Sequence, residues 1–171
     1  CRLRIACAGN QGCKILLAKG ETSVRLPQSK ALTAHRIGDL VYYAFPSIDE
    51  LPFIRHGFST RLGGVSDGVY KAMNLGFTRG DNQEDVHENF RRICSAMGAE
   101  VDDVVISAQQ HHTNIYDATP DDRGRGITRE RAYTDIDGLV TCHSRVMLCT
   151  QYADCVPLFF VDPIRRVVAT S

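Results

Sequence analysis

The sequence has no excess of charge of either sign. Its 171 residues include 20 Lys and Arg and 20 Asp and Glu, so the formal net charge is zero, and the pI is near 7.1. Proteins that bind a nucleic-acid backbone or an anionic membrane surface usually display a basic field. We therefore expect neither nucleic acid nor a membrane among the partners of this protein.

Long apolar runs are also missing from the sequence. No run approaches the roughly 20 residues that a membrane-spanning helix needs, and the N-terminus lacks the basic stretch, apolar core and cleavage site of a secretion signal. The seven cysteines form no regular framework, which fits a reducing compartment better than a disulfide scaffold. We expect a soluble protein of the cytoplasm.

One stretch of the sequence has the pattern of an amphipathic helix. Four apolar residues recur at i, i+4, i+7 and i+11 and so share one helical face: Val86, Phe90, Ile93 and Met97. Asp81 or Asn82 can cap the first turn, and Gly98 follows the last one. The sequence therefore predicts a helix over residues 83–97 that buries this face in the core.

Short apolar runs elsewhere in the sequence predict strands. The runs are residues 41–45, 104–107, 115–116, 146–150, 156–161 and 167–170. Residues 3–8 and 15–18 predict a hairpin or a pair of short strands, and residues 47–52 predict a turn. One long helix among several short strands predicts a mixed α/β (α+β) fold, in the form of a single domain with a mixed β-sheet and flanking helices.

Two unusual polar segments each follow one of these predicted strands. Cys155 lies in a short turn after the run 146–150, and His111 lies just after the run 104–107. Taken alone, Cys155 reads as a core residue, because free cysteine is among the most buried residue types. A cysteine and a histidine at two strand ends nevertheless predict one shared site.

These residues leave two kinds of chemistry open. A catalytic zinc site draws three protein ligands from separate elements, and His111 with Cys155 is a suitable pair. Four candidates are open for the third ligand: His112, His56, His143 or a residue after Ser171. Alternatively, Cys155 is a nucleophile with His111 as its base, and Asp154 or Asn114 orients that base.

The segment 61–81 is rich in glycine. Its glycines are Gly63, Gly64, Gly68, Gly76 and Gly80. Glycine lets the backbone turn tightly and lets a ligand approach backbone N–H groups. The spacing matches neither a Walker motif nor a dinucleotide fingerprint. The segment is therefore either a binding loop of another kind or a connection without a ligand.

Several short motifs point, in order, to a known family. They are His56–Ser66, Met73–Gly76, Gly80–Asp81, Val86–Asn89, Gln109–His111, Asp137–Thr141 and Ala153–Pro157. Through these motifs the chain resembles the laccase-domain proteins. That family was formerly called multicopper polyphenol oxidases, is now regarded as zinc-dependent purine nucleoside phosphorylases, and includes proteins described as peptidoglycan editing factors. The resemblance spans about residues 40–171, and it implies a laccase-domain fold.

The resemblance implies a zinc site. The family binds the metal through the histidine of Gln-x-His, the cysteine of Ala-Asp-Cys and a histidine that opens a later His-x-Gly-Trp-Arg-Gly motif. The first two ligands carry over to His111 and Cys155, and the third falls just after Ser171. The resemblance also implies residues that bind phosphate or substrate: Arg61 as the anchor, with Ser59 and Asn74 in support. A guanidinium can grip phosphate in a bidentate way.

The implied reaction is phosphorolysis of adenosine or inosine to the free base and ribose 1-phosphate. Adenosine deamination and methylthioadenosine cleavage are further implied activities, with a purine nucleoside and phosphate as partners. Copper is a poor alternative to Zn²⁺, because no compact set of two histidines, a cysteine and an axial methionine surrounds Cys155. Two other functions stay open: a cysteine hydrolase that acts on a peptidoglycan precursor, and a domain that binds purines without turning them over.

The boundaries of the chain lead to further expectations. We expect residues 1–40 to form an N-terminal extension or the first strands, and residues 41–171 to form the laccase-like domain, incomplete at its C-terminal end. A start at Cys1 and an end inside a predicted strand indicate a piece of a longer protein. With two of three implied zinc ligands present, we expect the 171-residue chain alone to bind zinc weakly and to turn over nothing.

Overall fold

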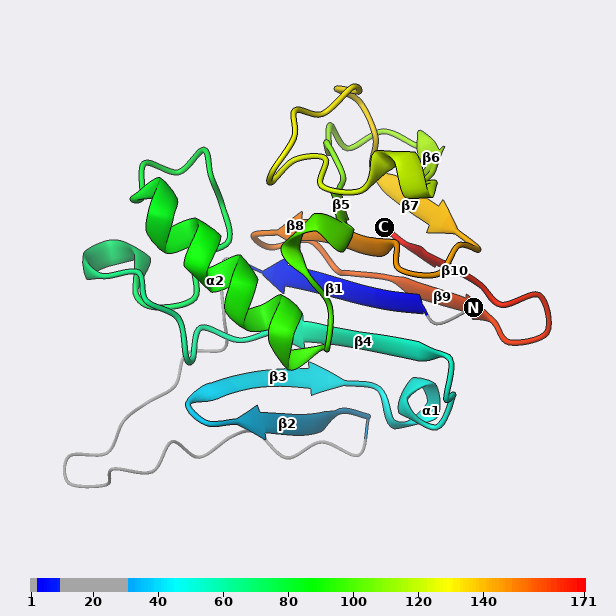
Figure 1. Ribbon diagram of the computed structural model, residues 1–171, viewed down its shortest axis with the longest axis horizontal. Coiled ribbons are helices and arrows are strands. Elements are labelled where there is room, and N and C mark those ends of the chain that lie inside the picture. The colour runs from blue at the N-terminus through cyan, green and yellow to red at the C-terminus, as the bar shows by residue number, and fades with distance from the viewer. Residues whose placement is uncertain (1–2, 10–30) are drawn as a thin grey trace.

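A computed structural model describes the backbone of residues 3–9 and 31–171 and the side chains of residues 31–171 (Figure 1). The larger sheet has the strand order β2-β3-β4-β1-β8-β5. Its strands are β1 (Leu3–Gly9), β2 (Thr33–Ile37), β3 (Leu40–Ala44), β4 (Ile54–Ser59), β5 (Val104–Ile106) and β8 (Met147–Tyr152). β4, β1, β8 and β5 run parallel to one another, while β3 and β2 extend the sheet in antiparallel pairs.

A smaller sheet has the strand order β6-β7-β10-β9. Its strands are β6 (Ile115–Asp117), β7 (Gly138–Thr141), β9 (Phe159–Asp162) and β10 (Val167–Thr170). β6 pairs with β7 in parallel, and β10 pairs with β7 and β9 in antiparallel fashion. Because both sheets mix parallel and antiparallel pairs beside helices, the predicted mixed α/β class is confirmed, and the division into two sheets is a feature that the sequence did not predict.

The predicted amphipathic helix is confirmed as α2 (Gln83–Ala96). Its N-cap is Asn82, whose side chain accepts a hydrogen bond from the backbone N–H of Glu84 at 2.9 Å. The predicted apolar face is buried: Val86, Phe90, Ile93 and Met97. The remaining helices are short: α1 (Pro46–Asp49), η1 (Gly68–Tyr70), η2 (Val101–Asp103) and η3 (Pro120–Asp122).

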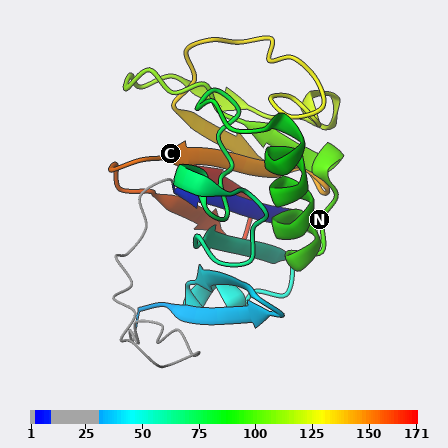
Figure 2. The same ribbon diagram turned by 90° about the vertical axis from the view of Figure 1, so that its left-hand side faces the viewer.

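The larger sheet separates two hydrophobic cores. On one face α2 packs against alternate residues of the strands, including Met147 and Cys149 of β8. On the other face the smaller sheet packs against the intervening residues, including Leu148 and Tyr152. The side view in Figure 2 shows α2 to one side of the central strands. The fold therefore has three layers, and β8 contributes to both cores because its side chains alternate between faces.

Three predictions about local structure need correction. Leu3–Gly9 is a strand, but both of its edges pair in parallel, with β4 and β8, so no edge is left for a hairpin partner. The run 15–18 lies outside the described residues. Residues 47–52 do not form a simple turn, because Pro46 at the first helical position starts α1. The predicted strand at 156–161 begins only at Phe159.

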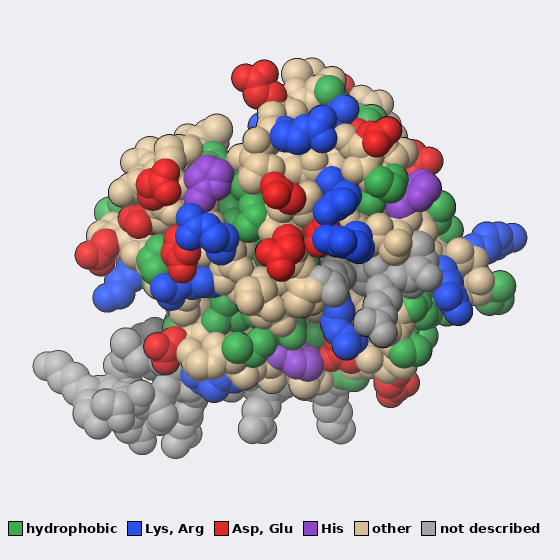
Figure 3. Space-filling model, viewed as in Figure 1, with side chains coloured by type: hydrophobic (Ala, Val, Ile, Leu, Met, Phe, Trp, Pro, Cys, Tyr) green, Lys and Arg blue, Asp and Glu red, His purple; other side chains and the backbone are tan. Residues whose placement is uncertain are grey.

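The surface agrees with the neutral composition. Figure 3 shows acidic and basic side chains interspersed over one face, without a field of one sign. Within the described part of the chain, no helix combines the length and the apolar character that crossing a membrane requires.

Candidate metal and substrate site

A pocket of about 220 Å³ lies where three loops meet beyond the parallel strands of the larger sheet. One loop follows β4, one follows β5, and the third is the continuation of β8. Ligands of such sheets commonly bind outside the carboxyl ends of the parallel strands, because these ends meet at one edge. The lining residues are Met73, Leu75, Gly76, Arg79, Gln109, His111, Gln151, Tyr152, Ala153, Asp154 and Cys155.

The predicted pair of His111 and Cys155 is brought together in this pocket. Parallel pairing of β5 with β8 explains the proximity, since Ile106 lies opposite Cys149 and both strands then enter the pocket from the same direction. The two strand ends thus bring these two residues to the lining of one pocket, and their joint site stays a prediction. Their roles stay predictions.

The turn that presents His111 is held by one carboxylate. Asp137 accepts hydrogen bonds from the backbone N–H groups of Gln110 at 3.1 Å, His111 at 2.7 Å and His112 at 3.1 Å. His111 has a φ of 62°, in the left-handed region that non-glycine residues rarely adopt. The Asp137 carboxylate thus stabilises an unusual backbone conformation at the predicted ligand.

Burial of Asp137 by itself disfavours its charged form, since only 7% of the residue is exposed. The three backbone N–H groups and the nearby His111 outweigh this effect, and the pKa of Asp137 is lowered below its usual range. The carboxylate is therefore ionised throughout the neutral range, where it keeps all three hydrogen bonds.

The segment that presents Cys155 is much less constrained. Ala153–Val156 are exposed, and within the described residues Ala153–Pro157 make no hydrogen bonds. The flanking residues are fixed, because Tyr152 ends β8 and Leu158 exchanges two backbone hydrogen bonds with Ser171. Cys149 of β8 is buried against α2, whereas the Cys155 thiol reaches solvent.

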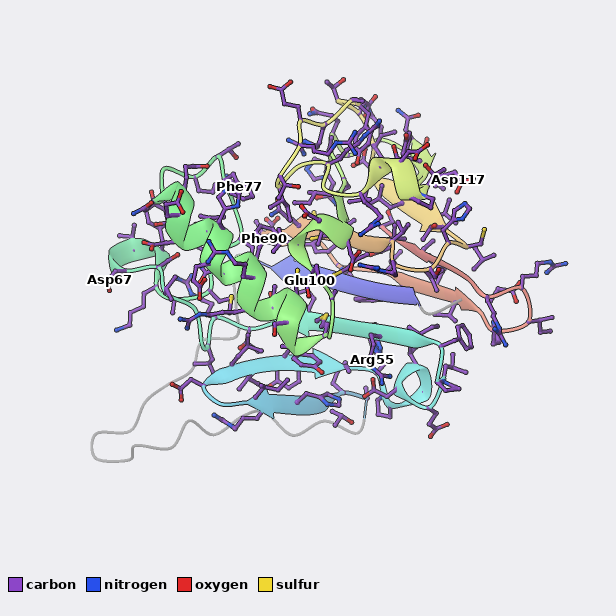
Figure 4. All side chains as sticks on the ribbon, viewed as in Figure 1. Arg55, Asp67, Phe77, Phe90, Glu100 and Asp117 are labelled. Carbon is purple, nitrogen blue, oxygen red and sulfur yellow. The ribbon has the colours of Figure 1, made fainter. Side chains whose placement is uncertain are left out.

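The glycine-rich segment supplies the third wall of the pocket. Its backbone is fastened to α2 by the buried side chain of Asn89, which donates to the carbonyls of Asn74 at 2.8 Å and Ala72 at 3.3 Å. Gly64 allows this packing, because a Cβ there would lie 2.2 Å from the carbonyl oxygen of Ala72. Phe77 stacks on Phe90 of α2 with ring centroids 5.5 Å apart, and both are labelled in Figure 4.

The other predicted site residues lie outside the pocket lining. The guanidinium of Arg61 donates to the carbonyls of Lys71 at 2.8 Å and of Val69 at 3.4 Å. Ser59 is buried at the end of β4. Asn74 is also buried, where it donates to the carboxylate of Asp81 at 2.8 Å. Arg61 and Asn74 thus hold the loop, and Asn74 sits between the lining residues Met73 and Leu75.

None of the three histidines proposed as a third ligand lines the pocket. His112 is exposed and pairs with Asp135 at 3.0 Å, and this hydrogen bond raises the pKa of His112 above its usual value. His56 is buried, where its Nε2 accepts the backbone N–H of Phe45 at 2.7 Å. Burial lowers the pKa of His56, despite the nearby Asp49. His143 is exposed beyond β7.

The donor set in the pocket suits a borderline-soft metal. An imidazole and a thiol are the ligand types that zinc prefers, and both line the same pocket. Among residues 31–171, no three His, Cys, Asp or Glu side chains are grouped closely enough to hold a metal ion. His111 and Cys155 therefore fit two positions of a zinc site, and the described residues provide no third.

Sequence reasoning missed two residues of the site. Arg79 lines the pocket, and Gln151 lines it while its amide donates to the carbonyl of Leu75. The available signal for Arg79 was its place in the glycine-rich segment, which the sequence had marked as a possible binding loop. Gln151 carried no signal, because it follows an apolar run and reads as part of a strand.

Comparison with known proteins matches residues 55–171 to the family model described as "Multi-copper polyphenol oxidoreductase laccase". The chain is 36% identical over 116 residues to "Purine nucleoside phosphorylase YlmD" of Geobacillus stearothermophilus, and 34% identical over 116 residues to the protein of that name from Bacillus subtilis. Each match covers 67% of this chain and 42% of the relative.

Solved structures share the fold. A structure titled as the Bacillus licheniformis hypothetical protein YfiH matches with a TM-score of 0.73 and 26% identity, over 84% of this chain and 52% of that one. The chain thus spans about half the length, or less, of the relatives that it matches.

Proposed function

Because this chain belongs to the multi-copper polyphenol oxidoreductase laccase family, we propose that it forms part of a zinc-dependent purine nucleoside phosphorylase. The reaction is the phosphorolysis of adenosine or inosine to the free base and ribose 1-phosphate. Adenosine deamination and methylthioadenosine cleavage are further proposed activities. The relatives that carry the name purine nucleoside phosphorylase support this assignment.

The single observation that carries the proposal is the meeting of His111 and Cys155 in one pocket. In the family motifs these two residues occupy ligand positions, and in the fold they arrive from different strands. We propose that they hold Zn²⁺ together with a third ligand outside the described residues. When bound there, zinc supplies a Lewis acid to the pocket.

Other side chains of the pocket are proposed to bind and orient the substrate and to hold His111 in place. Met73, Leu75 and Tyr152 line the pocket and offer apolar surface to a flat purine ring. Gln109 and Gln151 bring amide groups that can orient a polar substrate by hydrogen bonding. Asp137 keeps His111 in position through the backbone, so that the imidazole enters the pocket in one direction.

The test uses the longest native form of the protein that contains these residues, loaded with zinc. Incubation with inosine and inorganic phosphate is expected to release hypoxanthine and ribose 1-phosphate. Omission of phosphate should abolish hypoxanthine release. If no hypoxanthine forms while a known phosphorylase reacts under the same conditions, the proposed function is wrong.

A cysteine hydrolase is the second candidate, because the Cys155 thiol is exposed beside the same His111. Such an enzyme needs a free thiolate, whereas a zinc ligand is shielded. Iodoacetamide labelling with and without zinc distinguishes them, and exposed Cys142 is the internal control. Protection of Cys155 by stoichiometric zinc supports the phosphorylase, and a metal-free protein with a reactive Cys155 supports the hydrolase.

The division of the chain stays a proposal as well. We propose that residues 41–171 form the laccase-like unit and that residues 1–40 contribute its first strands. The pairing of β1 with β4 and β8, and of β2 with β3, supports this choice over a separate extension. A cytoplasmic location also stays a prediction.

A further inference from the structure

Arg79 is the only Arg or Lys among the described residues that line the pocket of His111 and Cys155. Within the described part of the chain, its guanidinium has no hydrogen-bond or salt-bridge partner. A guanidinium has five N–H donors and stays charged at any physiological pH. A cation with free donors at the wall of a concave site is available to bind an anion.

The backbone of Arg79 is fixed even though its side chain is exposed. The hydroxyl of Tyr70 donates to the carbonyl of Arg79 at 2.7 Å. The side chain passes close over Gly76, since a Cβ on that glycine would lie 3.0 Å from Cγ of Arg79. On either side of Gly76, the carbonyls of Leu75 and Phe77 accept hydrogen bonds from Gln151 and Gln83.

Arg61 acts on the same loop from a different position. Its guanidinium binds the carbonyls of Val69 and Lys71, the two neighbours of Tyr70. Arg61 therefore holds the segment whose central tyrosine holds Arg79. With its donors used on these carbonyls, Arg61 has fewer left for a ligand than Arg79 has.

The pocket also contains an acidic side chain, whose charge Arg79 can offset. Asp154 also lines the pocket, and its carboxylate disfavours a second anion nearby. Arg79 offsets this repulsion and can grip a tetrahedral oxyanion through two parallel N–H···O bonds. An anion on Arg79 is then placed in the same pocket as the two proposed zinc ligands.

We infer that Arg79 is the residue that binds the phosphate group of the substrate or product, and that Arg61 is a positioning residue for it. The inference rests on the proposed function for naming phosphate as the anion. Inorganic phosphate, the substrate, and ribose 1-phosphate, the product, both present a phosphate group that Arg79 could bind. It moves the anchoring role predicted for Arg61 to a residue that lies in the pocket.

The test measures binding of inorganic phosphate by calorimetry in the same form of the protein. Arg79→Gln should weaken phosphate binding at least about tenfold, because hydrogen bonds to a charged group are lost. Arg79→Lys keeps the positive charge but loses the planar guanidinium that can make two parallel hydrogen bonds. Its affinity for phosphate should therefore lie between those of wild type and Arg79→Gln. Arg36→Gln, an exposed change on β2 outside the pocket, is the matched control and should leave the affinity unchanged.

Arg61→Gln separates the two arginines. It should lower thermal stability and weaken phosphate binding less than Arg79→Gln does. Two results overturn the inference: wild-type protein without saturable phosphate binding, or Arg79→Gln with wild-type phosphate affinity. In the second case, loss of phosphate binding in a folded Arg61→Gln protein would return the anchoring role to Arg61.

Kinetics keep this inference distinct from the proposed function. In an active enzyme, Arg79→Gln should raise the KM for phosphate at least about tenfold and change the KM for inosine much less. If wild type releases hypoxanthine and Arg79→Gln has an unchanged phosphate KM, the function stands and the inference is wrong. If wild type is inactive but binds phosphate through Arg79, the inference stands and the function is wrong.

Discussion

The two segments that present the predicted zinc ligands are built in different ways. The turn at His111 is tied by three backbone N–H groups to one buried carboxylate, and Ala108 is paired with Ile136 just before it. The segment at Cys155 is exposed and is fixed only at its ends, by β8 and by the pairing of Leu158 with Ser171. One side of the pocket is rigid, and the other can adjust.

Because of this difference, the two segments should lose different amounts of conformational entropy when a ligand binds. A preorganised histidine loses little conformational freedom when it binds a ligand, whereas ordering of the Cys155 segment costs roughly 1–2 kcal/mol per residue fixed. Asp137 should therefore affect zinc affinity indirectly, because it fixes the backbone that presents His111. Cys155 should affect it directly, through the proposed bond between its sulfur and zinc.

The largest effect is expected at the rigid side. Asp137→Ala leaves three backbone N–H groups without their acceptor and should lower the free energy of unfolding by about 2–4 kcal/mol in urea titrations. Zinc affinity should also fall, by roughly 10–100-fold, as for other residues that orient a ligand. Asp135→Ala is the control, because that carboxylate is more exposed and contacts only side chains. Equal effects of the two changes would contradict the proposed role of Asp137.

At Cys155, a substitution should change zinc affinity but hardly change the free energy of unfolding. Cys155→Ala should weaken zinc binding about 100-fold or more, because it removes a proposed ligand, and should change the unfolding free energy by less than about 0.5 kcal/mol. Cys149→Ser is the opposite control, since it places a hydroxyl in the core and should lower stability but not intrinsic zinc affinity. Competition with a chromophoric chelator measures the affinity. Unchanged zinc affinity in Cys155→Ala would remove this residue from the site.

At low pH, Asp137 should no longer contribute to the stability of the turn at His111. The pKa of Asp137 is lowered in the folded state, so its contribution to stability is present above the unfolded pKa of about 4 and is lost as pH falls through the folded value. The difference in unfolding free energy between wild type and Asp137→Asn should therefore be constant near pH 7 and shrink below about pH 4. A difference that stays constant down to pH 2 would show that ionisation of Asp137 does not contribute.

The smallest effect concerns the neighbour of the rigid ligand. Asp135 raises the pKa of His112, chiefly through their hydrogen bond, so this pair contributes most below the unfolded histidine pKa of about 6.5 and loses its contribution as pH rises through the folded value. NMR titration of the His112 ring should give a pKa above about 6.5 that falls towards it in Asp135→Asn. Since His112 is exposed, stability should hardly change. An unshifted His112 pKa in wild type would contradict the pairing.

Much of the fold could be predicted because its signals are local. The face of α2 follows from a helical repeat of apolar residues, and β3, β5 and β10 follow from short apolar runs. The parallel pairing of β1 with β4 and β8 could not be predicted, because it joins segments that are far apart in the sequence. Local propensity carries no information about such register.

In the site, too, residues with a local sequence signal could be predicted, and residues whose role depends on the folded chain could not. His111 and Cys155 were predicted because their residue types are rare and their positions follow strands. The supporting residues were harder: Asn89 is a polar residue on the apolar side of α2, and its four hydrogen bonds reach the loop only after folding. The lining by Arg79 depends on Tyr70 and Gly76, which are neighbours only in the folded chain.

The left-handed backbone at position 111 has a consequence for protein engineering. At a φ of 62°, glycine is the residue that the backbone prefers, and a non-glycine residue in this region costs of order 1–3 kcal/mol. A search for thermostable variants would therefore favour glycine at position 111. The resulting protein would melt at a higher temperature and would have lost a proposed ligand, so selection for stability alone would steadily remove the proposed activity.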